Sequence, residues 1–160
     1  TESKNMLDWE VKTISRFAPK KAQKRKENDR SLVPIRGNTD FEQIADGAQF
    51  FACGDLPTLQ SKGEYKNSNP KYGEFYKSAL TIPIRCVTHE ERAEDDDVYD
   101  IIGFLCLDSD SVCPDWERDD NYVYGFTALL ADSLYILLRE NMEYITNIQQ
   151  SQTNGKIGDA

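Results

Sequence analysis

Residue types and motifs on which several common activities depend are scarce or missing in this sequence of 160 residues. It holds one histidine, His89, and no GxSxG segment, which disfavours a hydrolase triad. Neither GxxxxGK[ST] nor GxGxxG occurs, which argues against kinase, nucleotide hydrolase and dinucleotide-binding functions. No apolar run approaches the roughly 20 residues of a membrane-spanning helix. We therefore expect a soluble protein without a catalytic centre of these kinds.

Cysteine is present, but in no pattern typical of a disulfide scaffold or a zinc site. None of the four cysteines, Cys53, Cys86, Cys106 and Cys113, forms a CxxC pair, which fits a reducing cytoplasm. If strands at 79–87 and 101–108 pair around a tip at 88–100, Cys86 and Cys106 lie roughly 13 Å apart. That separation is too long for a disulfide or a shared metal, so we predict no metal site.

The negative charge is concentrated in one segment. Residues 89–120 hold thirteen acids and two arginines, a balance of −11, and because the whole chain carries −9 the remainder is at +2. Such a surface argues against nucleic acid as a partner. The basic segment 20–26 is interpreted as a solvated helix end or linker, and the alternative is a juxtamembrane or nucleic-acid contact.

The length suits one domain, which we place at residues 1–150. It divides into an N-terminal helical segment at 1–30, a sheet with loops at 31–116 and a C-terminal helix at 117–150. Residues 151–160 are predicted to be a disordered tail. Apolar residues at helical spacing predict an amphipathic helix over 2–18, before Pro19.

Two apolar segments predict the main strands. Residues 79–87 alternate in character, whereas residues 101–107 are apolar on both faces, so the strand at 101–108 is expected to be the central one. Pro83 lacks an amide hydrogen, which suggests a bulge, a gap or an edge beside it. The very acidic residues 88–100 are interpreted as a solvated hairpin tip.

Shorter elements are expected before these strands. Residues 32–35 suggest a strand, and Thr39 is a possible cap for a short helix at 40–46. A brief apolar segment ends at the turn Gly54-Asp55, and residues 64–76 form an irregular loop rich in tyrosine and asparagine.

Aromatic and polar side chains between residues 50 and 78 suggest a small-ligand pocket, since such pockets combine apolar walls with a few hydrogen-bonding groups. The candidate ligand-binding residues are Phe50, Phe51, Asp55, Tyr65, Asn67, Tyr72, Tyr76 and Ser78. The alternative is that these aromatics are ordinary core.

Three segments resemble the GAF domain, a sensory fold of signalling proteins. They are YKSALTIPIR at 76–85, IIGFLCLDSD at 101–110 and FTALLADSLYILL at 126–138. The resemblance implies an α+β, profilin-like fold. In it a central antiparallel sheet carries the N- and C-terminal helices on one face, and loops with short helices enclose a ligand cavity on the other.

The same resemblance implies a non-catalytic regulatory domain that binds an unidentified small molecule and signals through its terminal helices to an output domain. We expect that output domain on the parent chain, a homodimer through the terminal helices, and a cytoplasmic location, with membrane anchoring of the parent protein left open. No cofactor is indicated. The alternatives are an interaction or dimerisation module without ligand and a cysteine-dependent reductase of free methionine sulfoxide.

Overall fold

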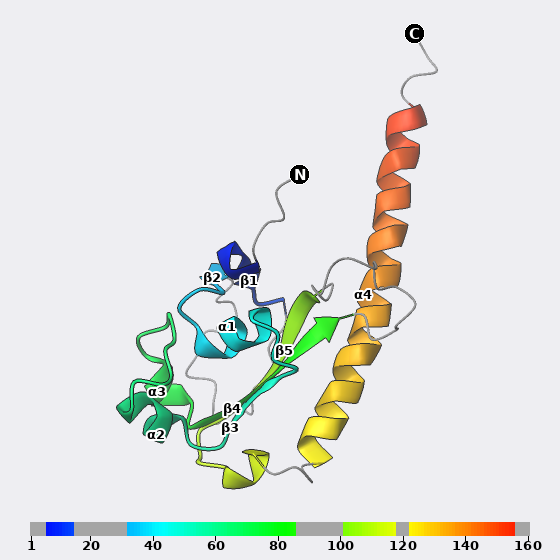
Figure 1. Ribbon diagram of the computed structural model, residues 1–160. Helices are drawn as coiled ribbons and strands as arrows, with labels where there is room; N and C mark the ends of the chain where they lie inside the picture. Colours follow the sequence, from blue (N-terminus) through cyan, green and yellow to red (C-terminus); the bar gives the residue numbers. More distant parts are fainter. Residues whose placement is uncertain (1–5, 15–31, 86–100, 118–121, 156–160) are drawn as a thin grey trace. The chain divides into compact units, whose positions relative to one another are not determined.

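The computed structural model describes residues 6–14, 32–85, 101–117 and 122–155, with the side chains of the last helix described through residue 141. Figure 1 shows the elements in chain order. They are η1 (Met6–Asp8), β1 (Glu10–Lys12), β2 (Leu32–Pro34), α1 (Thr39–Ala45), β3 (Phe51–Cys53), α2 (Leu56–Ser61), α3 (Tyr72–Phe75), β4 (Ser78–Arg85), β5 (Ile101–Ser109), η4 (Pro114–Glu117) and α4 (Tyr122–Gly155).

The fold is α+β, with two small sheets. One sheet pairs β1 with β2, and the other has the order β3-β4-β5. The chain divides into two compact units, residues 1–81 with 106–121 and residues 82–105 with 122–160. Strands β4 and β5 each contribute to both units, and the assignment of residues 1–150 to a single domain stays a prediction.

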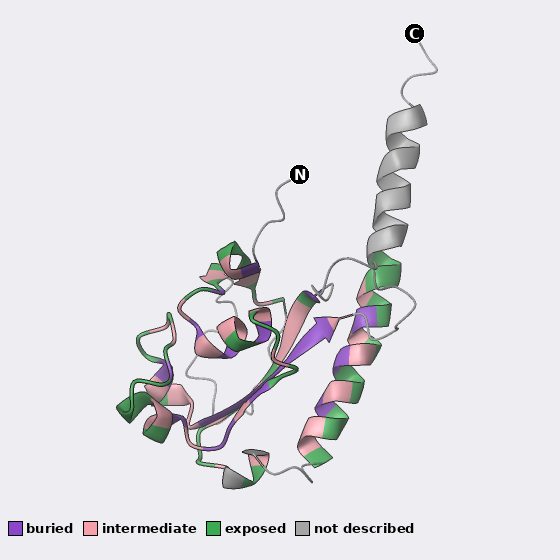
Figure 2. Ribbon diagram, viewed as in Figure 1, coloured by how far each residue is buried: buried purple, intermediate pink, exposed green. Residues whose placement is uncertain are grey.

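Strand β4, and not β5, is the middle strand of its sheet. Every residue of β4 except Arg85 is buried, whereas β5 alternates half-buried with exposed positions along most of its length (Figure 2). The expectation that residues 101–108 form the central strand is therefore wrong, although both strands were placed correctly in the sequence. Pairing of β4 with β3 ends at Thr81, two residues before Pro83.

The predicted helix over residues 2–18 is wrong in the part that the structure describes. There the chain forms a single 3-10 turn, η1, and then strand β1, in which Val11 pairs with Val33 of β2. Val11, Thr13 and Ile14 are β-branched and favour extended backbone. Their local preference and the available partner strand outweigh the helical spacing of the apolar residues.

The strand expected at 32–35 and the short helix expected at 40–46 are present as β2 and α1, with a change at the start of α1, whereas α2 was not predicted. The N-cap of α1 is Asn38 and not Thr39, and the Asn38 side chain makes no capping bond to the helix. Helix α2 has a true side-chain cap, because the Asp55 carboxylate accepts hydrogen bonds from the amide and hydroxyl of Thr58.

Helix α4 is 34 residues long and extends to Gly155, so the expected disordered tail is wrong for residues 151–155. Thr127, Ala131 and Tyr135, spaced four apart, form its buried stripe. Across the described residues, no helix is both long and apolar enough to cross a membrane. The acidic tip at 88–100, with His89, and the basic segment at 20–26 lie outside the described residues.

Candidate functional site

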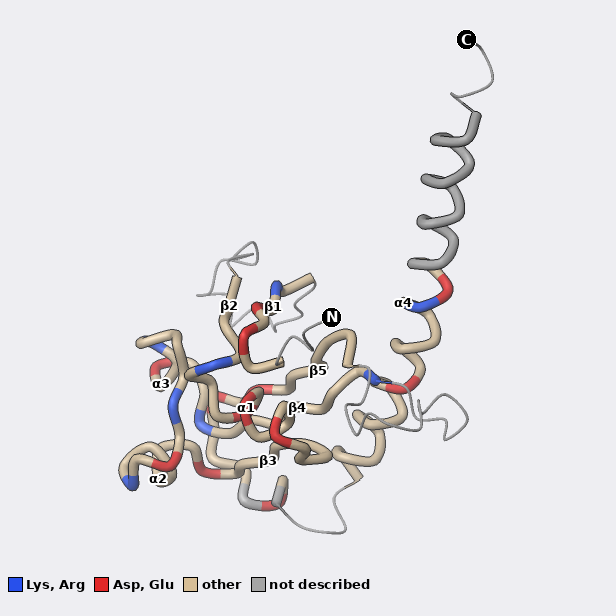
Figure 3. The backbone as a smooth tube through the Cα atoms, turned by 45° about the horizontal axis from the view of Figure 1, so that its top comes forward, with Lys and Arg blue, Asp and Glu red and all other residues tan. Residues whose placement is uncertain are grey.

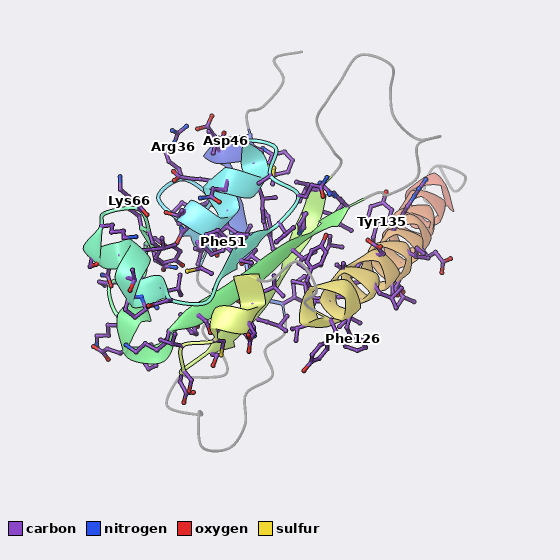
Figure 4. The ribbon with its side chains drawn as sticks, turned by 60° about the horizontal axis from the view of Figure 1, so that its bottom comes forward. Arg36, Asp46, Phe51, Lys66, Phe126 and Tyr135 are labelled. Carbon is purple, nitrogen blue, oxygen red and sulfur yellow. The ribbon has the colours of Figure 1, made fainter. Side chains whose placement is uncertain are left out.

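Three aromatic rings from separate elements form a chain over one face of the β3-β4-β5 sheet. Phe51 of β3 pairs in register with Thr81 of β4, so their side chains lie on the same face. The ring of Phe51 lies 5.9 Å from that of Tyr65, which in turn lies 5.2 Å from Tyr72 in an edge-on arrangement. All three side chains are buried. Figure 4 shows Phe51 between the strands and the elements that cover them.

The segment that carries Tyr65 is tied to the start of α1. The Thr39 amide donates to the carbonyl of Lys66, and the Lys66 amide donates to the Thr39 hydroxyl over 2.8 Å. Beside them the Asn38 Oδ1 accepts from the amide of Ser68 over 2.9 Å, while its Nδ2 donates to the carbonyl of Pro34. The side chains of Asn38 and Thr39 thus hold the covering segment in place. Because the Asn38 side chain is used in this way, it makes no capping hydrogen bond to α1.

Asp40, the next residue of α1, is a carboxyl group taken almost entirely out of water, with 7% of its surface exposed. One oxygen, Oδ2, accepts a hydrogen bond of 3.2 Å from the hydroxyl of Thr81. The other, Oδ1, is buried and has no hydrogen-bond partner among the described residues. Burial raises the pKa of Asp40, and the backbone amides of Phe41 and Asp40 and the Thr81 hydroxyl offset only part of that increase.

Two tyrosine hydroxyls share this environment. Burial raises the pKa of Tyr65, and the charges of Asp40 and Asp108 raise it further, although the hydrogen bond from Asn67 acts in the opposite direction. Burial also raises the pKa of Tyr72, whose hydroxyl is a second buried group without a hydrogen-bond partner in the described part of the chain. Both tyrosines therefore stay neutral and available as hydrogen-bond donors across the physiological range.

The structure brings four of the eight candidate ligand-binding residues together, namely Phe51, Tyr65, Asn67 and Tyr72. The other four lie elsewhere. Phe50 precedes β3 and is partly exposed, Asp55 caps α2, and Tyr76 contacts the ring of Phe75. Ser78 occupies the opposite face of β4 from Thr81, because strand side chains alternate, and its hydroxyl donates to the Ser111 carbonyl.

No family model matches the chain, and no curated protein or solved structure matches it significantly. The likeness to GAF domains therefore depends on the three sequence segments and on the α+β class alone.

None of the described cysteines is a member of the aromatic cluster. Cys53 is buried, Cys113 is half-buried, and none of the described cysteines forms a disulfide. Cys106, on strand β5, is exposed. Within the described residues, no group of three or more His, Cys, Asp or Glu side chains could hold a metal ion.

Sequence reasoning missed Asp40 and Thr81, which complete the cluster. A weak signal for Asp40 exists, since it lies four residues before Ile44 on the face of α1 that is buried. For Thr81 the signal was its position in an alternating strand, which places it on one face with Ala79. Neither signal says that the two side chains meet, because their contact joins positions 41 residues apart.

Replacing Asp40 with asparagine is expected to make stability less dependent on pH. A carboxyl whose pKa is raised on folding contributes stability that is fully present below its unfolded pKa of about 3.9 and is lost as pH rises through the folded value. Asparagine retains an acceptor for Thr81 but does not ionise. The gain in unfolding free energy of Asp40→Asn over the native protein should therefore grow as pH rises from acid to neutral.

Denaturant unfolding across a pH series measures this difference. Asp46→Asn is a suitable control, because Asp46 is an exposed carboxylate at the end of the same helix (Figure 4). Parallel stability curves for native protein and Asp40→Asn would show that Asp40 is not held in a raised-pKa environment.

Proposed function

We propose that this chain is a non-catalytic regulatory domain of GAF-like fold that binds a small molecule between the β3-β4 face and the segment 62–71. The observation that carries the proposal is the pair of buried polar groups without a protein partner, Asp40 Oδ1 and the Tyr72 hydroxyl. Such groups cost about 1–3 kcal/mol each when nothing satisfies them. A ligand that hydrogen-bonds to both would remove that cost.

The surroundings favour a ligand with an apolar body. Phe51, Tyr65 and Tyr72 offer three aromatic surfaces, and Tyr65 with Asn67 adds polar groups at one side. This combination of apolar walls with a few convergent polar groups is typical of small-molecule sites. The hydrogen bonds that Asn38 accepts from Ser68 and Thr39 accepts from Lys66 would close the covering segment over the bound molecule.

Regulation requires two conformations of the domain, and the ligand must bind one of them more tightly than the other. Strands β4 and β5 connect the ligand-binding unit with the unit that contains α4, because each strand contributes residues to both. A change at Thr81 would pass along β4 to residues 82–85, which belong to the unit that contains α4. On this proposal α4 conveys the bound state to an output domain on the parent chain, in the cytoplasm.

Tyr72→Phe tests the binding site with little disturbance to the fold. Phenylalanine keeps the ring and its contact with Tyr65 while removing a hydroxyl that no described residue satisfies, so the unliganded variant should be as stable as the native protein or slightly more stable. In a thermal-shift screen of metabolites, a ligand at a hundred times its Kd should add about 2.7 kcal/mol to the native protein. The same ligand should stabilise Tyr72→Phe by less.

Asn67→Ala provides a comparison at the edge of the cluster, where the Tyr65 hydroxyl loses a donor. A screen without any shift, or a ligand whose effect is identical in native protein and Tyr72→Phe, would count against this site.

A second function is favoured by a different observation, the apolar exposed face of α4. Phe126, Leu129, Ile136 and Leu137 are each more than half exposed. We propose that this face joins two copies of the chain in a homodimer. Such a dimer is compatible with the regulatory function, and it would also serve an interaction module that binds no ligand.

A further inference from the structure

The ligand site contains a buried carboxyl group without a cation partner among the described residues. Asp40 makes no ion pair within the described residues, where the salt bridge that is formed joins Arg36 to Asp8 on the surface. Its neighbours are the Thr81 hydroxyl, the backbone amides of Phe41 and Asp40, and Tyr65, on which its charge acts. A carboxylate that is removed from water without a cation partner is an unusual feature, because burial normally requires pairing.

A second carboxylate, that of Asp108, also influences the Tyr65 hydroxyl. The charges of Asp40 and Asp108 both act on the Tyr65 hydroxyl, one from helix α1 and the other from strand β5. The larger of the two effects on Tyr65 comes from Asp40, because Asp108 occupies an exposed position of β5. A negative charge at the buried position of Asp40 attracts a cation and repels phosphate or carboxylate groups. Figure 3 shows acidic positions on α1 and on the strands of this unit.

The aromatic rings reinforce the same preference. The face of an aromatic ring is negative, so it attracts a cation that lies over it. Tyr65 and Tyr72 meet edge to face, so their rings are differently oriented, with an interplanar angle of 62°. Aromatic surfaces facing different ways beside a buried carboxylate are characteristic of sites for organic cations.

We infer that the molecule recognised at this site is a small organic cation, an amine or amidine with an apolar body, whose N–H groups donate to Asp40 Oδ1 and whose charge is paired with the Asp40 carboxylate. The Tyr72 hydroxyl satisfies a second polar group of the same ligand. This inference rests on the proposed binding function, and it adds the chemical class of the ligand.

The ligand class also gives a reason for an aspartate at position 40. Asparagine would satisfy Thr81 equally well and would avoid the burial of a charge, so the fold alone does not require a carboxyl at position 40. A cationic ligand requires it. In the unliganded protein burial raises the pKa of the Asp40 carboxyl, and in the complex the cation pairs with it.

Three compounds of nearly the same shape test whether the site prefers a positively charged ligand. Benzylamine, benzyl alcohol and benzoate share an aromatic body and differ in carrying a positive, zero and negative charge near neutral pH. Binding to the full chain is measured by ligand-observed NMR and titration calorimetry. We expect benzylamine to bind at least tenfold more tightly than benzyl alcohol and benzoate to show no binding.

Asp40→Asn should abolish the preference, lowering benzylamine affinity at least tenfold while leaving that of benzyl alcohol within about twofold. Asp46→Asn removes an exposed carboxylate from the same helix and controls for general attraction of amines to an acidic protein. Circular dichroism of each variant verifies that it is folded.

The outcomes separate the two proposals. Loss of the amine preference in Asp40→Asn alone supports the inference. Equal binding of the amine and the alcohol, or an amine preference that survives Asp40→Asn, overturns the cationic ligand class while the binding function stands. If no compound of any charge binds and a metabolite screen is also without effect, both the inference and the proposed function are overturned.

Discussion

Replacing Leu80 with alanine is expected to lower the free energy of unfolding by about 2–5 kcal/mol, because the side chain is fully buried in the middle strand of the sheet. The loss combines the transfer of apolar groups with the cavity left between well-packed neighbours. Urea unfolding, with an unchanged dependence on denaturant, measures it. A loss of this size is a large fraction of the stability of an average domain.

Leu107→Ala is the matched control, since Leu107 belongs to β5 and is only half-buried. Its replacement should cost about half as much or less. The comparison tests the strand order directly, because a central β5 would make the Leu107 substitution as damaging as that of Leu80. Equal losses would contradict the order β3-β4-β5.

The misplacement of the central strand has a physical reason. Residues 101–107 are apolar on both faces, and such a run is typical of a strand covered on both sides. In β4, by contrast, Ser78, Thr81 and Pro83 interrupt the apolar residues, yet they are buried. Ser78 and Thr81 are buried because specific partners satisfy their hydroxyls, and partners from distant segments cannot be recognised in a sequence.

The sequence indicated which residue types form the candidate site, but it did not indicate which of them come together. Composition alone indicated aromatic and polar side chains between residues 50 and 78, and Phe51, Tyr65, Asn67 and Tyr72 do gather. Asp55 looked equally suitable, but its carboxylate is used locally to cap α2. Asp40 was missed because an aspartate in the first turn of a helix is ordinarily exposed to water, where its charge interacts favourably with the helix dipole.

Helix α4 has two different faces in its described part. Thr127, Ala131 and Tyr135 are buried, whereas the other face exposes large apolar side chains, which are Tyr122, Phe126, Leu129, Leu130, Ile136 and Leu137. Charged residues are sparse between residues 122 and 138, as Figure 3 shows. Phe126 projects from the helix into solvent (Figure 4).

Apolar side chains gathered on one exposed helix face usually mark an interface. Phe126, Leu129 and Ile136 lie three and then seven residues apart, a spacing found in helices that pack side by side, with Ser133 between the last two. A helix of 34 residues is about 50 Å long, which is sufficient for an interface of the size found in stable dimers. We propose a second copy of this chain as the partner because a twofold dimer needs only one self-complementary surface.

Replacing both Phe126 and Leu129 with lysine is expected to convert the dimer into a monomer. Each residue occurs twice in a symmetric dimer, and burial of each such side chain contributes roughly 1.5–3 kcal/mol, so the association should weaken by about a thousandfold or more. Light scattering measures the change, from twice the chain mass of 18.3 kDa to the single mass. Circular dichroism should show the same helix content.

Asp46→Lys is the matched control, because it changes the net charge by the same two units at an exposed position of α1 and should leave the dimer intact. A native protein that scatters as a monomer at high concentration would refute the dimer outright. A dimer that persists in the double lysine variant would place the interface on another surface. If the dimer depends on Phe126 and Leu129, ligands that stabilise the native protein but not Tyr72→Phe can then be tested for their effect on its dissociation, which links the two proposed sites by a measured coupling free energy.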